Sequence, residues 1–148
     1  RVSAIALNVG FDMAGAAVNV AVGGSQAKAQ TVKNNTATAL EISYPVSDAL
    51  SATIGASSGT IAAGDEDNMF VTAAYTMDAD TTLSVGYARG DHTDASNVLD
   101  KASVTSVNIS RSLGGGVSVF AEYAAVANDN ATVSSTGNSF AVGTVVAF

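Results

Sequence analysis

Apolar and polar residues alternate along most of the chain. In the first such segment Ile5, Leu7 and Val9 share one parity, and Asn8 and its small neighbours share the other. The same alternation returns in later segments, for example over residues 83–87 and 106–110. Because side chains two residues apart lie on the same face of a β-strand, the pattern predicts strands with one apolar face and one small or polar face.

Strand-like segments rich in Val, Ile, Thr, Phe and Tyr are separated by clusters of Gly, Asp, Asn and Ser, which favours an all-β, antiparallel up-and-down sheet. We expect about nine strands, each about 9 to 11 residues long, the length that a tilted membrane strand needs. The expected limits are residues 2–11, 16–24, 36–44, 50–58, 69–77, 82–90, 103–112, 117–126 and 139–148.

The connections between these segments also alternate in length. Short turns are expected at residues 12–15, 45–48, 78–81 and 114–116, where the residue types tolerate turn dihedrals. Longer polar loops are expected at residues 25–35, 59–68, 91–102 and 127–138. Short turns on one rim and long loops on the other are typical of outer-membrane barrels.

Composition points the same way. The chain is 47% hydrophobic and only 13% charged, with a mean hydropathy of +0.29, whereas a soluble domain carries about a quarter of its residues as charged types. No apolar run reaches the length of about 18 residues that a transmembrane helix needs. If the chain crosses a membrane, it crosses with strands.

The charge and cysteine content exclude several classes of function. A net charge of −7 with six Lys and Arg residues offers no basic cluster for nucleic acid, and without cysteine there is neither a thiol nucleophile nor a cysteine metal site. No cofactor is expected. The chain opens at Arg1 without a starting Met or a secretory signal, so we expect a processed product or a fragment.

Aromatic residues fall near the ends of the expected strands. Such placement suits the two aromatic girdles of a membrane barrel. The expected members near the short-turn rim are Phe11, Tyr44, Tyr75 and Phe148, and those near the loop rim are Phe70, Tyr87 and Phe140.

The last segment, SFAVGTVVAF (residues 139–148), resembles the closing strand of Gram-negative outer-membrane barrels. That strand ends in Phe, with apolar residues at alternate positions before it. Phe140, Val142, Val146 and Phe148 fit the pattern, and Thr144 interrupts it. The resemblance implies that these four residues form a signal for the barrel-assembly machinery.

Two further segments are similar to porins of the alphaproteobacterial type: FVTAAYTMDADTTLSVGYARGD (70–91) and LGGGVSVFAEYAAV (113–126). This family resemblance implies a trimeric, sixteen-stranded barrel with a water-filled pore in the outer membrane, in contact with lipid and lipopolysaccharide. Nine strands depart from the even number of single-chain bacterial barrels. We therefore expect residues 1–148 to be the C-terminal part of one barrel domain whose N-terminal strands lie elsewhere.

The polar face supplies the candidate pore-lining residues, which are Asn8, Asn19, Glu41, Asn108 and Glu122. Carboxylates in a channel raise the local concentration of cations and repel anions. The simpler interpretation is that these residues are only the solvated wall of the pore.

Other charged residues carry weaker hypotheses. Arg89 and Arg111 lie at strand ends, where a long cationic side chain can reach the membrane interface. Asp65, Glu66 and Asp67 are oxygen-rich but lack the spacing of a known calcium loop, so a solvated loop is the safer interpretation, as it is for Asp91, Asp94 and Asp100. The lone His92, expected in a loop, makes a poor metal site.

The sequence therefore predicts a general diffusion porin and not an enzyme. The alternative is a soluble all-β module, such as a surface adhesin, a fibre subunit or a β-sandwich, which also hides one face of each strand. The two hypotheses differ in what the apolar face touches: hydrocarbon in a porin, or a second sheet and a compact core in the soluble module.

Overall fold

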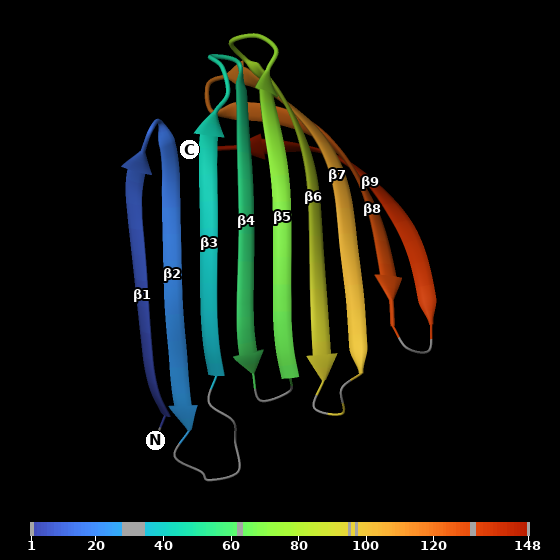
Figure 1. Ribbon diagram of the computed structural model, residues 1–148. Helices are drawn as coiled ribbons and strands as arrows, with labels where there is room; N and C mark the ends of the chain where they lie inside the picture. Colours follow the sequence, from blue (N-terminus) through green and yellow to red (C-terminus); the bar gives the residue numbers. More distant parts are fainter. Residues whose placement is uncertain are drawn as a thin grey trace.

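The computed structural model describes residues 2–27, 35–61, 64–94, 96, 98–130 and 133–147. Within these ranges the chain forms nine strands and no helix, as expected from the sequence (Figure 1). No helix there is long and apolar enough to span a membrane. The strands are β1 (Val2–Met13), β2 (Ala16–Ala27), β3 (Asn35–Pro45), β4 (Leu50–Ile61), β5 (Gly64–Thr76), β6 (Thr81–Asp94), β7 (Leu99–Gly114), β8 (Val117–Asp129) and β9 (Ser134–Val146).

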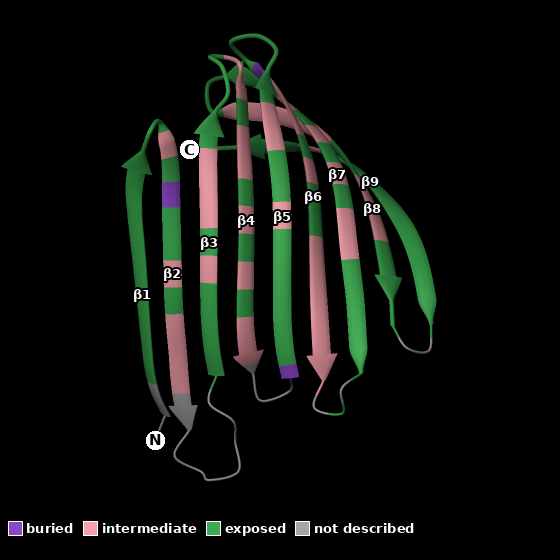
Figure 2. Ribbon diagram, in the orientation of Figure 1, coloured by how far each residue is buried: buried purple, intermediate pink, exposed green. Residues whose placement is uncertain are grey.

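The strands form a single sheet in chain order, and every neighbouring pair is antiparallel. In the described part of the chain no second sheet covers it, and the one buried apolar side chain is Val18, which is 5% exposed. Figure 2 accordingly shows exposed and half-buried residues along all nine strands. The sheet has no compact core, so the β-sandwich alternative is wrong.

The register of the sheet is staggered steadily from β1 to β9. The row of cross-strand partners that starts at Phe11, beside the turn end of β1, passes through Tyr87 and reaches Asn138, toward the opposite end of β9. The strands are therefore displaced along their axes in one direction while the sheet curves (Figure 1). A stagger of this kind produces the strand tilt of about 35 to 45° that closes a sheet into a barrel.

The four short turns lie close to where the sequence predicts them. Ala14 and Gly15 join β1 to β2 with positive φ angles of 51° and 83°, and Gly114, at the end of β7, and Gly115 and Gly116, which join it to β8, all have positive φ. In the β5–β6 turn the Asp78 carboxylate accepts the N–H of Asp80 at 2.9 Å. These are backbone conformations for which Gly and Asp are suited.

The long loops were predicted too long, because strands continue into all four of them, furthest into the last three. β4 and β5 are hydrogen-bonded as far as Ile61 and Gly64, β6 and β7 as far as Thr93 and Leu99, and β8 and β9 as far as Asp129 and Ser134. The side chains of these extensions are mostly polar on both faces, so the regular apolar alternation ends before the backbone ladder does. Of the expected loop 25–35, residues 28–34 lie outside the described residues.

Candidate functional site

The sheet has two chemically distinct faces. We call the first the apolar face; its large side chains run from Ile5 in β1 to Phe140 and Val142 in β9, and these three are 78%, 71% and 68% exposed. Cross-strand partners stay on one face, and the register joins apolar residues to apolar ones, as in the row of Val9, Val20 and Leu40. The other face, here called the polar face, consists mainly of Gly, Ala, Ser, Thr and Asn, with several carboxylates.

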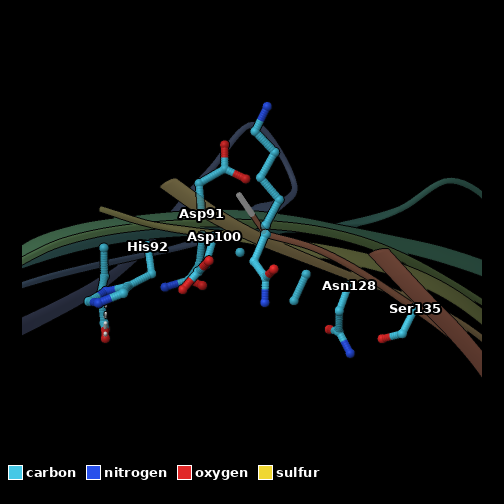
Figure 3. A pocket seen from close by; sticks show the side chains of 11 residues that line it. Asp91, His92, Asp100, Asn128 and Ser135 are labelled. Atoms are coloured by element: carbon cyan, nitrogen blue, oxygen red, sulfur yellow. Dashed lines mark ion pairs between the residues drawn. The ribbon is translucent and has the colours of Figure 1, made fainter. Parts of the chain in front are cut away.

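The polar face is the concave one. Figure 3 shows His92, Asp100, Asn128 and Ser135 beneath the arch of the ribbon, whereas Asp91 projects from the opposite side. The register connects these residues to the rest of the polar face, because His92 pairs with both Glu66 and Asp100, and Asn128 pairs with Ser135. A closed barrel that continued this curvature would hold the polar residues inside and the apolar residues outside.

All five pore-lining candidates lie on this concave face, where we call them the polar belt: Asn8, Asn19, Glu41, Asn108 and Glu122. They come from both ends of the sheet but lie at a similar depth. Glu41 lies a few residues before Pro45, where β3 ends at a short turn. Glu122 lies about as many residues after Val117, where β8 begins at another short turn. The stagger of the register brings them to one level above the short turns.

One side-chain hydrogen bond and one cross-strand pair connect members of the polar belt. The amide of Asn19 donates to the Glu41 carboxylate at 3.3 Å, and Asn108 stands directly opposite Glu122 in the register. Nearby on the same face, Ser43 and Thr53 share a hydrogen bond of 2.8 Å. These neighbours do not neutralise Glu41 and Glu122, since amides and hydroxyls carry no net charge.

Closer to the loop rim, the concave face holds a second group of acids around a hollow of about 490 Å³. His92 lies between Glu66 and Asp100, and its Nδ1 is 3.8 Å from the Glu66 Oε1 (Figure 3). Glu66, His92, Asp91 and Asp100 were all expected in loops, and so was Asp94. They instead lie in the strand extensions of β5, β6 and β7.

This arrangement does not build a calcium site from Asp65, Glu66 and Asp67. As consecutive strand residues they point to alternate faces, with Glu66 on the concave side and the other two on the convex side. Among the described residues no group of three or more His, Cys, Asp or Glu side chains could hold a metal ion.

The described cations all lie on the convex, apolar face, at its two borders. Arg89 makes a two-pronged contact with Asp91, at 2.9 and 2.8 Å, toward the loops. Arg111 donates to Thr81 at 2.8 Å and to Asp78 at 3.3 Å, beside the short turns. Lys101 is opposite Asp91 in the register and so shares its face.

Five of the expected interface aromatics share the apolar face. Phe11, Tyr44 and Tyr75 lie on it near the short turns, and Tyr87 and Phe140 are its last apolar side chains before Arg89 and Asn138. Their girdle role stays a prediction, and Phe148 lies outside the described residues.

The exception is Phe70, which was expected at the interface and instead lies on the concave face. It pairs with Gly55, where an added Cβ would collide with the ring. Phe120 does the same over Gly143, with a distance of 2.6 Å from the ring to the position of an added Cβ. The parity that Phe70 shares with Thr72 and Ala74 indicates this face in the sequence.

The residues of the proposed assembly signal lie along the outermost strand. Phe140, Val142 and Val146 share the apolar face of β9, and all three are exposed. Phe148, the fourth member, lies outside the described residues. The recognition role stays a prediction.

Comparison with known proteins connects this geometry to a family. Residues 2–131 match the model of the Gram-negative porin family. No curated protein matches the chain significantly.

Solved structures with the same fold include OmpT, an outer membrane protein of Vibrio cholerae. The in-vitro folded form has a TM-score of 0.72 and 18% identity, and the match covers 98% of this chain and 55% of that chain. Outer-membrane expressed OmpT has a TM-score of 0.71 and 19% identity, and the match covers 99% of this chain and 56% of that chain. A trimer form of OmpT has a TM-score of 0.71 and 18% identity, and the match covers 98% of this chain and 56% of that chain. The chain thus spans about half the length of these structures.

Proposed function

This chain belongs to the Gram-negative porin family and is located in the outer membrane, which it crosses with strands; we propose that it forms part of the wall of a water-filled channel. The channel carries ions and small hydrophilic solutes by passive diffusion. The observation that supports this most strongly is the division of one uncovered sheet into a convex apolar face and a concave polar face. The convex apolar face is compatible with lipid hydrocarbon, and the concave polar face is compatible with water.

The proposal includes closure of the barrel. Within the described residues, β1 and β9 each pair on one side only, and in hydrocarbon the other edge would leave backbone N–H and C=O groups without partners. We infer that N-terminal strands of the same barrel domain pair with β1 and β9, up to the sixteen strands that the family resemblance implies.

The remaining partners follow from the same proposal. The apolar face contacts outer-membrane lipid and, at its loop border, lipopolysaccharide. The barrel assembles as a homotrimer, which the trimer form of OmpT from Vibrio cholerae supports. Phe140, Val142, Val146 and Phe148 act as the signal for the assembly machinery.

Channel activity is tested by inserting the purified full-length protein into a planar lipid bilayer. We expect stepwise increases of current at constant voltage, each step corresponding to one inserted barrel or trimer. Folded protein that inserts without any conducting step would refute the channel. Folding is checked beforehand by the shift in electrophoretic mobility between unheated and boiled samples.

A further inference from the structure

Acidic side chains lie on both faces of the sheet, but the described Lys and Arg side chains lie only on the convex face. The carboxylates on the concave face are Asp12, Glu41, Glu66, Asp94, Asp100 and Glu122, whereas Arg89, Lys101 and Arg111 all lie on the convex face. Among the described residues, His92 is the one potentially cationic side chain on the concave side. The concave wall is therefore acidic along its whole described height.

The arginines cannot compensate this charge by bending into the channel. Arg89 is held by both oxygens of Asp91 on the convex face, and Arg111 is held there by Asp78 and Thr81. Their partners neutralise them locally. Within the described residues, the cross-strand partners of these two acids are neutral: Glu41 accepts a hydrogen bond from Asn19 and pairs with Gly55, and Glu122 pairs with Asn108 and Ala141.

The equal depth of Glu41 and Glu122 gives this charge a position in the channel. Carboxylates at one level of a pore act as a partial ring, and acidic rings favour cations in channels. The wall behind them is protein and hydrocarbon of low dielectric constant, which concentrates the field in the water-filled space. Over distances shorter than the Debye length of about 10 Å at 0.1 M salt, the field is only weakly screened.

We propose that the channel is selective for cations, with Glu41 and Glu122 as the selectivity-determining residues of the polar belt. The inference rests on the proposed channel function and names its preferred class of solute: small hydrophilic cations pass more readily than anions of the same size. The acids around His92 act in the same direction nearer the loops.

The experiment measures the reversal potential of the full-length protein in a planar bilayer under a gradient of KCl. We expect a K⁺ to Cl⁻ permeability ratio above unity, larger in dilute than in concentrated salt. In the double variant Glu41→Gln and Glu122→Gln the ratio falls roughly twofold, because the partial ring is lost while the shape of the side chains is kept. Conductance steps persist.

The matched control is the double variant Asp65→Asn and Asp67→Asn, which removes the same charge from the convex face of β5. It leaves the ratio unchanged if the concave wall sets selectivity. Equal loss in both double variants, or in neither, overturns the proposal. A ratio at or below unity in the unaltered protein also overturns it while leaving the channel intact, whereas a lack of conducting steps refutes the channel itself. If the Gln variant fails to fold, the permeability ratio of the unaltered protein is compared in dilute and in concentrated salt. A ratio that is not larger in dilute salt overturns the proposal.

Discussion

On the convex face of this sheet the side chains are large and apolar and lie open, whereas on the concave face Gly, Ala and Ser alternate with Asn and Glu. Both faces are made by the same strands, since each residue that serves one face is followed by a residue that serves the other. The difference shows that the fold needs no core: the convex face is complementary to hydrocarbon and the concave face to water. Substitutions should therefore have effects that depend on the face more than on the strand.

The largest effect is expected from a charge placed in the middle of the apolar face. Val71→Arg should lower the free energy of unfolding by about 2–4 kcal/mol, the cost of a cation at the centre of the membrane on a lipid-facing strand position. The measurement is urea-induced unfolding in lipid vesicles. The folded fraction at each urea concentration is the fraction of protein that, in unheated samples, migrates with the electrophoretic mobility of the folded form.

The control for this comparison is the next residue of β5. Thr72→Arg places the same side chain on the polar face, where it meets water, and we expect a loss below about 1 kcal/mol. If the two arginines destabilise equally, the assignment of the faces is wrong.

A smaller effect is expected on the concave face itself, where Phe70 covers Gly55. Gly55→Ala introduces a Cβ into the space of the ring, and we expect a loss of about 1–3 kcal/mol from overpacking. In the background of Phe70→Ala the same change should cost less, because the obstructing ring is gone. Additive losses in this double-mutant cycle would contradict the contact.

A weaker effect on stability is expected for Arg111, at the turn border of the apolar face. Arg111→Ala removes the contacts with Asp78 and Thr81, and we expect a loss of about 0.2–1 kcal/mol, since the pair is exposed. Increasing salt from low concentration should reduce the difference between the variant and the unaltered protein. A loss of several kcal/mol would show that Arg111 has a structural role beyond this border.

The smallest effect is a dependence on pH in the β5–β6 turn. Hydrogen bonds from the backbone of Asp80 and the hydroxyl of Thr81 lower the pKa of Asp78 below its ordinary value. A carboxyl whose pKa is lower in the folded state stabilises the fold above its ordinary pKa, and this contribution is lost as the pH falls through the folded-state pKa.

Asp78→Asn should therefore flatten the stability profile slightly in the acidic range and leave it unchanged in shape near neutral pH. The measurement is the urea midpoint as a function of pH. An unchanged slope in acid would show that the Asp78 contacts contribute nothing to folding.

The number of strands and the two faces could be predicted from the sequence because a period of two is a local property. Ile5, Leu7 and Val9 indicate their common face without knowledge of any neighbour. The ends of the strands could not be predicted in this way. Between β5 and β6 the ladder continues from Asn68 and Gly90 to Gly64 and Asp94, where polar residues on both faces remove the alternation that marks a strand.

The arrangement of the candidate site depended on register, which a sequence with weakly distinguished neighbours does not specify. Glu41 and Glu122 could be placed on the polar face from parity alone. Their common depth depends on where β3 and β8 end and on the stagger between these strands, and the contact of Phe70 with Gly55 depends on the register of β4 and β5. The separation of Arg89 from the concave acids was visible in its parity with Tyr87 and Val85.

The charged borders of the apolar face also set the thickness of membrane that the protein fits. Along β6, Thr81 beside Arg111 and then Arg89 enclose Leu83, Val85 and Tyr87, a tilted stretch that spans roughly 20 Å along the membrane normal. A bilayer with longer acyl chains would have to thin around the barrel, at a cost of a fraction of a kcal/mol for each ångström. Short-chain lipids should therefore accept this protein more readily than long-chain lipids.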